Sequence, residues 1–226
     1  RYLKLSMKIF TFKSKPPLTP FAPQWDYPFG HENISHFIDC PKIASIVLSK
    51  EKNIIRKFPP MNRSSIDGYT DLGSNSLTSR YGYYNLIEWP EIEIQILRGR
   101  IIEFHKKFLK ELNVKISNPF FIKGWANVMR KGEKINPHLH NVQPDAYLSG
   151  HITIQCENTS TFYINPVNQL NEPEIKQIKN VPGEITLFPT CVPHYTDTHQ
   201  ALTERITIAF DLSLQTDKAK QTPKGE

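Results

Sequence analysis

The second half of the chain consists of short β-prone segments separated by turn residues, and this pattern restricts the fold more than any other feature. Segments rich in β-branched and aromatic residues cover 120–130, 147–156, 160–164, 184–188 and 205–213. Turn-forming pairs lie between them, at Lys131-Gly132, Asn165-Pro166 and Pro182-Gly183. Many short strands with such spacing indicate a sandwich, barrel or jelly roll and not a parallel α/β sheet.

The first half of the chain has a different pattern. Residues 1–90 are rich in proline, asparagine, serine and glycine, and we expect them to be irregular, with one short helix or strand across 34–52. A helix is predicted from Pro90 onward, because apolar residues recur at steps of three and four. These residues are Ile94, Leu97, Ile101, Phe104, Phe108 and Leu112. We expect this helix to pack its apolar face against a sheet.

Charge and cysteine content limit the partners and the cellular location that we expect. The net charge is +6, from 28 Lys and Arg against 22 Asp and Glu, but the basic residues are spread along the chain without a nucleic-acid signature. A solvated basic surface is therefore expected, and nucleic acid is not indicated as a partner. No apolar run approaches the roughly 20 residues that span a bilayer, so no membrane segment is expected. Three scattered cysteines favour a reducing, cytoplasmic location over a disulfide framework.

Two short windows contain the histidines that we single out. His138 and His140 are one residue apart in GEKINPHLHN, and His194 follows the later segment GEITLFPTCVP. On an extended backbone, residues i and i+2 point to the same side, so the first two imidazoles can share one cation. Imidazole suits iron, zinc, copper or nickel. A single histidine is more often a hydrogen-bonded or surface residue, but the third histidine favours a three-sided metal site.

Arg205 begins the last β-prone segment. Alternation places Arg205, Thr207 and Ala209 on one strand face, with Ile206, Ile208 and Phe210 on the other. An arginine and a hydroxyl two residues apart on an inward face can bind a carboxylate, the guanidinium as a bidentate partner and the threonine as a further donor. An arginine exposed at a strand start is the commoner alternative. The order of elements favours the carboxylate-binding interpretation.

This order resembles that of the 2-oxoglutarate/Fe(II)-dependent oxygenases. The segments that carry the resemblance lie in 120–213: WANVMRKGEKINPHLHN, YLSGHITI, GEITLFPTCVPH and ERITIAFDL. The resemblance implies a mainly β fold with helices (α+β), namely a double-stranded β-helix of the jelly-roll or cupin-like type. The expected organisation is a single domain over 1–226, with a helical and loop-rich N-terminal part over 1–118, the double-stranded β-helix core over 119–213 and a flexible tail over 214–226.

The resemblance also implies a site. In such enzymes a His-x-Asp/Glu pair and a distal histidine hold Fe(II), and 2-oxoglutarate chelates the metal with one end while Arg-x-Ser/Thr holds its far carboxylate. Carried over to this chain, His138 and His194 are ligands, and Arg205 and Thr207 bind the co-substrate tail. Asn127 is expected to support the other end of 2-oxoglutarate.

One position departs from the family pattern. His140 stands where the acidic ligand is usual, which changes the charge of the site by one unit. The expected metal-binding and catalytic set is therefore His138, His140 and His194. The alternative is that Asp145 reaches back to supply the carboxylate.

The same residues approximate the cupin pattern, which uses the same barrel. Its first motif matches Gly132, His138-x-His140 and Asp145, with Asp in place of Glu. Its second motif matches Gly183, Pro189, Cys191 and His194, with Cys in place of Gly. These matches leave two alternatives open: a cupin-type metalloprotein or dioxygenase that does not use 2-oxoglutarate, and a non-catalytic binding protein on the same barrel. Arg205-x-Thr207 favours the oxygenase.

The function that the resemblance implies is that of an enzyme, a 2-oxoglutarate- and Fe(II)-dependent dioxygenase. Such an enzyme hydroxylates its substrate and decarboxylates 2-oxoglutarate to succinate. Dioxygen and an unidentified substrate are the expected partners, and a peptide side chain, a free amino acid, a small metabolite and a nucleotide all stay open as the substrate. The oligomeric state stays open as well.

The sequence also suggests a location for three further residues. His151 shares a face with Ser149 and Thr153, and it either lines the pocket or is a hydrogen-bonded structural residue. Trp125 is a pocket wall or, more often for such a residue, part of the core. His199 is expected at the surface.

Overall fold

The computed structural model describes residues 7–14, 20, 26–61, 70–116, 119–140, 145–166 and 174–215. The helices are α1 (Cys40–Lys57) and α2 (Ile92–Glu111), with short 3-10 helices η1 (Thr78–Tyr83) and η2 (Leu86–Glu88). The strands are β1 (Lys8–Lys13), β2 (Asp26–Asn33), β3 (Phe120–Met129), β4 (Ala146–Gln155), β5 (Ser160–Ile164), β6 (Ile175–Lys179), β7 (Glu184–Pro189), β8 (His194–Thr196) and β9 (Arg205–Leu214).

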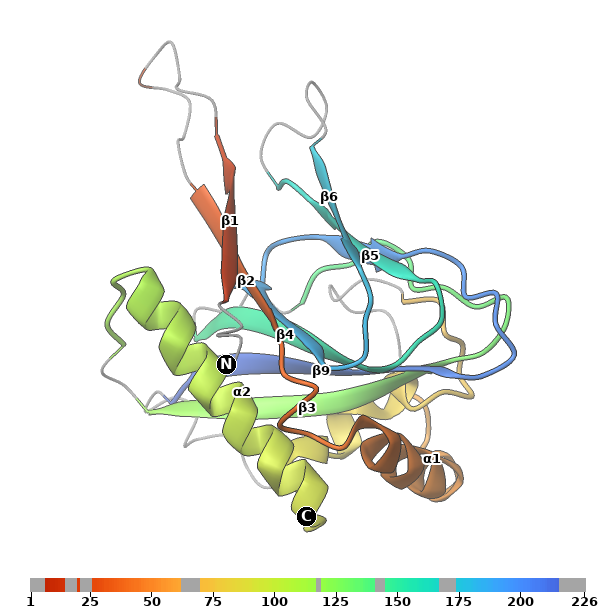
Figure 1. Cartoon of the computed structure of the whole chain (residues 1–226). Helices are drawn as coiled ribbons and strands as arrows, with labels where there is room; N and C mark the ends of the chain where they lie inside the picture. The colour runs from red at the N-terminus through yellow and green to blue at the C-terminus, as the bar shows by residue number, and fades with distance from the viewer. Residues whose placement is uncertain are drawn as a thin grey trace.

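The strands form two antiparallel sheets. The larger sheet has the order β1-β2-β7-β4-β9-β3, and the smaller has the order β6-β5-β8. From β4 onward the chain passes back and forth between the sheets, since β4, β7 and β9 lie in the larger sheet while β5, β6 and β8 lie in the smaller. Figure 1 shows the smaller sheet on one side of the larger sheet and the two helices on the other. The expected mainly β, jelly-roll architecture is therefore present.

Five strands lie where the sequence predicts them. β3, β4, β5, β7 and β9 agree with the expected segments to within one residue at each end. The sequence does not predict β6 and β8, which are five and three residues long. Such short strands carry too few alternating residues to be recognised from a single sequence.

The expectation that residues 1–90 are irregular is wrong. β1 and β2 form a hairpin, and β2 pairs with β7, Gly30 opposite Leu187. The short element predicted across 34–52 is an 18-residue helix, α1, where Asp39 accepts from the backbone N–H of Lys42 as the N-cap. The pairing with β7 supplies β2 with its hydrogen bonds, so a segment without clear alternation forms a strand.

The boundary between the N-terminal part and the core stays a prediction, although the larger sheet contains strands from both. Of the predicted tail 214–226, Leu214 ends β9, and residues 216–226 lie outside the described residues.

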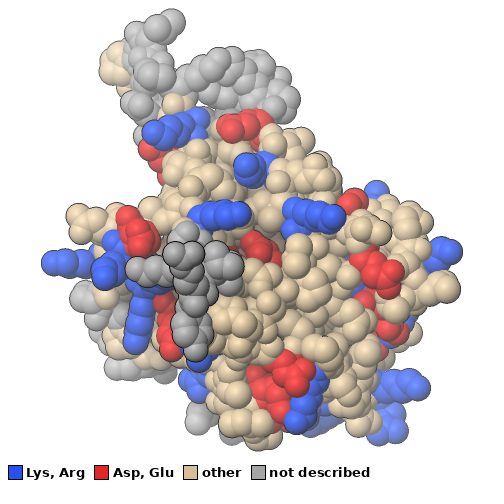
Figure 2. All heavy atoms as spheres, viewed as in Figure 1, with Lys and Arg blue, Asp and Glu red and all other residues tan. Residues whose placement is uncertain are grey.

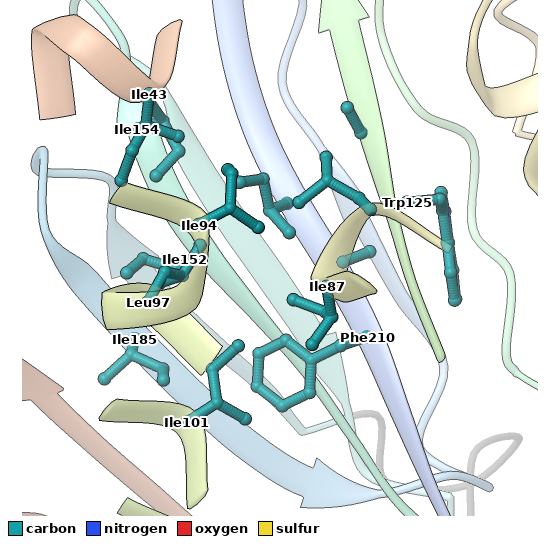
Figure 3. Close-up of a cluster of buried hydrophobic side chains, with 14 of the residues drawn as sticks. Ile43, Ile87, Ile94, Leu97, Ile101, Trp125, Ile152, Ile154, Ile185 and Phe210 are labelled. Atoms are coloured by element: carbon teal, nitrogen blue, oxygen red, sulfur yellow. The ribbon is translucent and has the colours of Figure 1, made fainter. Parts of the chain in front are cut away.

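Helix α2 packs its apolar stripe against the larger sheet. It begins at Ile92, two residues after Pro90, and the first five residues of the predicted stripe are buried. Figure 3 shows Ile94, Leu97 and Ile101 beside Ile152 and Ile185 of the sheet. This core lies on one face of the larger sheet, and the opposite face is turned toward the smaller sheet.

A second, aromatic cluster ties the two sheets together. Phe29 of β2 stacks on Phe188 of β7 at 5.6 Å between ring centroids, and its edge meets Tyr163 of β5 at 4.9 Å. Phe12 and Val192 complete the buried members. The N-terminal hairpin therefore contributes to holding the smaller sheet over the larger one.

The visible surface carries charges of both signs. Figure 2 shows Lys and Arg interspersed with Asp and Glu on the face viewed. Neither helix in the described part of the chain combines the length and apolarity that a bilayer crossing requires.

Candidate metal centre

Strand β9 has one apolar face and one polar face, as its alternating sequence predicts. Ile206, Ile208 and Phe210 are fully buried in the core beneath the helices. Arg205, Thr207, Ala209 and Asp211 therefore face the interior between the sheets. The neighbouring strand β4 continues this polar face, with Ser149 opposite Asp211 and Thr153 opposite Thr207.

The three histidines meet at one end of this interior. His138 and His194 form an isolated antiparallel bridge, in which each backbone N–H donates to the other residue's carbonyl, at 3.1 and 2.9 Å. The backbone N–H of His140 donates to the carbonyl of Thr190 at 3.2 Å. The His-x-His segment is thus extended along the β7–β8 turn, and one ligand atom from each of the three histidines lies within 4.8 Å of the other two.

Each imidazole is held in the same tautomer. Nδ1 of His138 lies 2.9 Å from the carbonyl oxygen of Asn136, and Nδ1 of His194 lies 3.1 Å from that of Val192. Nδ1 of His140 lies 2.6 Å from Oδ1 of Asp211. Carbonyl and carboxylate oxygens accept, so every Nδ1 donates its proton and every Nε2 keeps a free lone pair. Three such nitrogens fit a divalent metal ion such as iron and leave coordination positions open.

Burial keeps His138 and His194 neutral. Burial lowers the pKa of His138 to about 4, with a smaller effect of nearby His140. The pKa of His194 lies well below its usual value for the same first reason, followed by the neighbouring histidines. Since neutral imidazole is the form that binds a metal, the site is ready for a cation at neutral pH.

The structure does not bring Asp145 into this cluster. Within the described residues, the group that can hold a metal is His138, His140 and His194 alone. Of the two alternatives for the third position, the geometry favours His140.

Arg205 lies on the same inward face without a charged partner. Its side chain is fully buried, and its Nη1 and Nη2 lie 3.0 Å from Sδ of Met129 and 3.4 Å from Oγ1 of Thr161. Its Nε has no hydrogen-bond partner, and no ion pair among the described residues includes it. Burial lowers the pKa of Arg205 to about 10. A buried cation without an anion is costly, so this position is suited to an anionic ligand.

The other expected co-substrate residues lie beside Arg205. Thr207 of β9 pairs with Asn127 of β3 and with Thr153 of β4, and all three are buried. The Oδ1 of Asn127 accepts a hydrogen bond from the hydroxyl of Thr78 in η1 at 2.7 Å. The structure therefore brings Arg205, Thr207 and Asn127 into one polar row.

Strand β5 lies beside both this row and the histidines. Arg205 contacts Thr161 of β5, and Tyr163, two residues further, lies 6.0 Å from His194 between ring centroids. Two residues along a strand span about 6.6 Å.

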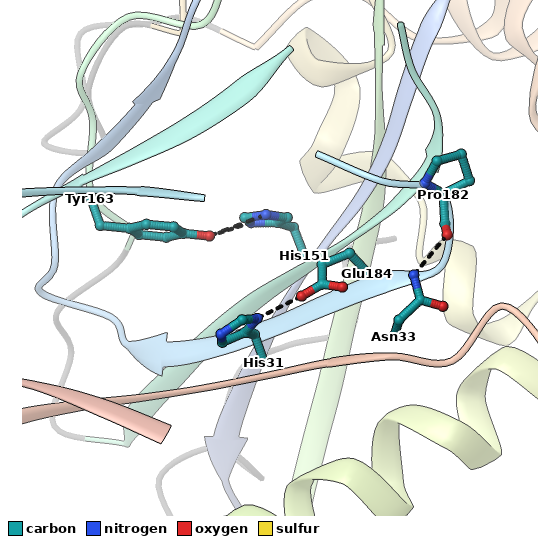
Figure 4. A network of polar contacts seen from close by, with 6 residues as sticks. All are labelled: His31, Asn33, His151, Tyr163, Pro182 and Glu184. Carbon is teal, nitrogen blue, oxygen red and sulfur yellow. Dashed lines mark hydrogen bonds and ion pairs between the residues drawn. The ribbon is translucent and has the colours of Figure 1, made fainter. Parts of the chain in front are cut away.

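His151 lies in the interior as well. Burial, then the charge of Arg205, then the two nearby histidines His140 and His138 lower the pKa of His151 to about 3. Figure 4 shows its ring facing the hydroxyl of Tyr163, 3.2 Å from Nε2. His151 is therefore a neutral interior residue between Arg205 and the histidine cluster.

Trp125 belongs to the buried hydrophobic cluster, as favoured, and its ring also lies 5.2 Å from that of His140. The prediction for His199 is wrong, because this residue is fully buried and its Nε2 lies 2.6 Å from the carbonyl oxygen of Thr203. Its backbone also bonds Gly132 and Glu133, so it fastens the loop after β8. Nothing in the polar segment TDTHQ predicts this burial.

Asp211 is the site residue that sequence reasoning missed. The alternation that places Arg205, Thr207 and Ala209 inward continues to Asp211 and could have identified it.

Fold and site together define a class: a double-stranded β-helix protein with a three-histidine site on its inward face. Residues 123–211 match the model of a family described as "Putative 2OG-Fe(II) oxygenase". The match supports the resemblance to the 2OG-Fe(II) oxygenases, an enzyme family of oxidoreductases whose metal and co-substrate are Fe(II) and 2-oxoglutarate.

Solved structures agree on the fold. A prolyl-4-hydroxylase from Pseudomonas putida is 12% identical, with a TM-score of 0.51 over 83% of this chain and 93% of that one. AviO1 from Streptomyces viridochromogenes Tue57 is 9% identical, with a TM-score of 0.51 over 88% of this chain and 92% of that one. At such identities the likeness concerns the fold alone. A search of curated proteins finds no match to this chain.

Proposed function

We propose that this protein is a 2-oxoglutarate- and Fe(II)-dependent dioxygenase that hydroxylates a substrate still to be identified. In this proposal His138, His140 and His194 hold the iron, and Arg205 and Thr207 hold the far carboxylate of 2-oxoglutarate. One observation carries the proposal: a buried guanidinium that forms no ion pair within the described residues shares an interior face with three convergent imidazoles.

When bound, Fe(II) and 2-oxoglutarate together supply the activation of dioxygen, with decarboxylation of 2-oxoglutarate to succinate and insertion of oxygen into a C–H bond. The residues of the chain would position the metal and the co-substrate. The Nδ1 hydrogen bonds fix the three ligand rings before the metal binds, so little reorganisation is needed.

The co-substrate is oriented by its far end. The Arg205 guanidinium offers several N–H donors to a carboxylate, and the hydroxyl of Thr207, two residues further on the same face, offers another. We propose that Asn127 supports the end of 2-oxoglutarate nearer the metal. The buried rings of Tyr163 and His151 line the interior and limit access of water.

A cupin-type metalloprotein that does not use 2-oxoglutarate is the second candidate. The all-histidine ligand set favours it, because no carboxylate ligand is present in the cluster. The buried Arg205 argues for the oxygenase, because burial of a cation costs free energy that a bound anion such as 2-oxoglutarate would offset.

Anaerobic titration separates the candidates. Addition of Fe(II) followed by 2-oxoglutarate should produce the weak visible charge-transfer absorption of the chelated metal. Metal binding without this absorption would favour the cupin-type protein. Absence of metal binding, after chelation and re-addition, would favour a non-catalytic binding protein.

We also propose a cytoplasmic location, supported by three cysteines that are all free thiols.

A further inference from the structure

Asp211 lies behind one of the three metal-binding rings. It projects from β9 into the interior, and its Oδ1 lies 2.6 Å from Nδ1 of His140. The same oxygen accepts a hydrogen bond from the hydroxyl of Ser149, its partner across β4, at 2.7 Å. Its side chain is largely buried, with 20% exposure, and so is that of His140, with 6%. This carboxylate is therefore held by two strands in a fixed position against the ring.

The three histidines differ in what holds their Nδ1. His138 and His194 each donate to the carbonyl of the residue two positions earlier, so the local backbone is enough to fix their rings. His140 donates to a charged side chain 71 residues away. Only the ring at the position of the missing carboxylate ligand has a carboxylate behind it.

A carboxylate in this place changes the ligand electronically as well as geometrically. It fixes the tautomer and the ring orientation, and it raises the basicity of the nitrogen that faces the metal. Three neutral imidazoles around a divalent cation leave a charge of two. One ionised carboxylate reduces this charge to one, the same total that two imidazoles and one carboxylate ligand produce.

We propose that Asp211 is a positioning residue that acts through His140 and supplies the negative charge which a carboxylate ligand would otherwise bring to the metal. This inference rests on the proposed metal site and deepens it. Asp211 does not coordinate the metal: it lies outside the group whose ligand atoms converge.

The experiment uses the full chain loaded with Co(II), a paramagnetic substitute for iron, without 2-oxoglutarate. Proton NMR in water should show three strongly shifted signals that vanish in deuterated water, one from the Nδ1–H of each ligand. Asp211→Asn should lose or displace one of the three signals and leave the other two. Its affinity for Co(II), measured by calorimetry, should fall roughly 10- to 100-fold.

Asp145→Asn is the matched control, because Asp145 is a neighbouring carboxylate outside the cluster, and it should leave affinity and all three signals unchanged. Asp211→Glu serves where Asp211→Asn does not fold. Its carboxylate is displaced by one methylene, so it should bind Co(II) more weakly than the wild-type protein and shift the same single signal.

The role of Asp211 and the existence of the metal site fail in different experiments. A wild-type protein that binds no Co(II) overturns the metal site itself. A wild-type protein that binds Co(II), with a folded Asp211 variant of unchanged affinity and spectrum, overturns the role of Asp211 and leaves the metal site intact.

Discussion

Two buried polar residues of the interior, His140 and Arg205, differ in whether a charged group contacts their side chain. The ring of His140 has a carboxylate within 2.6 Å of its Nδ1, whereas the guanidinium of Arg205 contacts neutral groups of Met129 and Thr161 and forms no ion pair within the described residues. A histidine whose Nδ1 donates to a carboxylate has its Nε2 available to bind a metal. A buried guanidinium that forms no ion pair is suited to binding an anion. The partners of these two side chains therefore distinguish the metal end of the site from its co-substrate end.

Arg205→Met tests the co-substrate end at this scale. The variant should keep its affinity for Co(II), while its affinity for 2-oxoglutarate should fall roughly 10- to 100-fold, because charge-assisted hydrogen bonds are lost. Its melting temperature without 2-oxoglutarate should be unchanged or raised, since an unpaired buried cation is replaced by an apolar side chain of similar length. Calorimetry and thermal unfolding measure both quantities. Arg100→Met, which changes an exposed arginine paired with Glu103, is the control, and equal loss of 2-oxoglutarate affinity in both variants would contradict the assignment.

At the scale of elements, β9 connects the core to the site. Its outward residues lie beneath the helices, and its inward residues include Arg205 at the first position and Asp211 near the end. Helix α2 keeps this strand in place by covering the outward face of the sheet (Figure 3). The packing of α2 is therefore a condition for the geometry of the site.

Leu97→Ala tests that packing. Leu97 is fully buried against the sheet, so its truncation should lower the free energy of unfolding by about 2–5 kcal/mol. Ile96→Ala, at the adjacent helix position with 41% exposure, should change it by less than about 0.5 kcal/mol. Urea unfolding monitored by circular dichroism measures the difference. Similar losses in both variants would show that α2 does not pack as described.

At the scale of the whole molecule, several histidines are neutral because the two sheets and the helices bury them. Burial lowers the pKa of His105 on α2 to about 4, and it lowers those of His138, His151 and His194 within the site. In the unfolded chain these rings regain a pKa of about 6.5. The unfolded state therefore binds more protons than the folded state between about pH 4 and 6.5.

This difference fixes the sign of the pH dependence. The free energy of unfolding of the metal-free protein should fall as the pH is lowered from about 6.5 toward 4, because the unfolded chain takes up protons that the folded chain does not. Urea unfolding at pH 7, 6 and 5 measures the trend. His105→Gln removes one titrating ring outside the metal site and should make the slope shallower. Stability that stays constant or rises toward pH 5 would contradict the burial of these neutral histidines.

Local pattern was sufficient for much of this protein. The alternation in 120–130 and 205–213 predicted two strands and the face that Arg205 and Thr207 share, because the period of two is a property of the strand itself. The apolar stripe predicted α2 for the same kind of reason. The spacing of His138 and His140, with distal His194, predicted a cluster that the folded chain assembles.

Only the tertiary structure decided what depends on contacts between distant segments. The strand β2 forms because β7 pairs with it, and His199 is buried because its loop packs against the turn at Gly132. The hydrogen bond between His140 and Asp211 joins residues 71 positions apart, and Arg205 lacks an anionic partner because of what surrounds it in three dimensions. The sequence determined which side chains face inward along each strand, whereas the packing of the two sheets determined which of them meet, since no local period encodes the pairing of one strand with another.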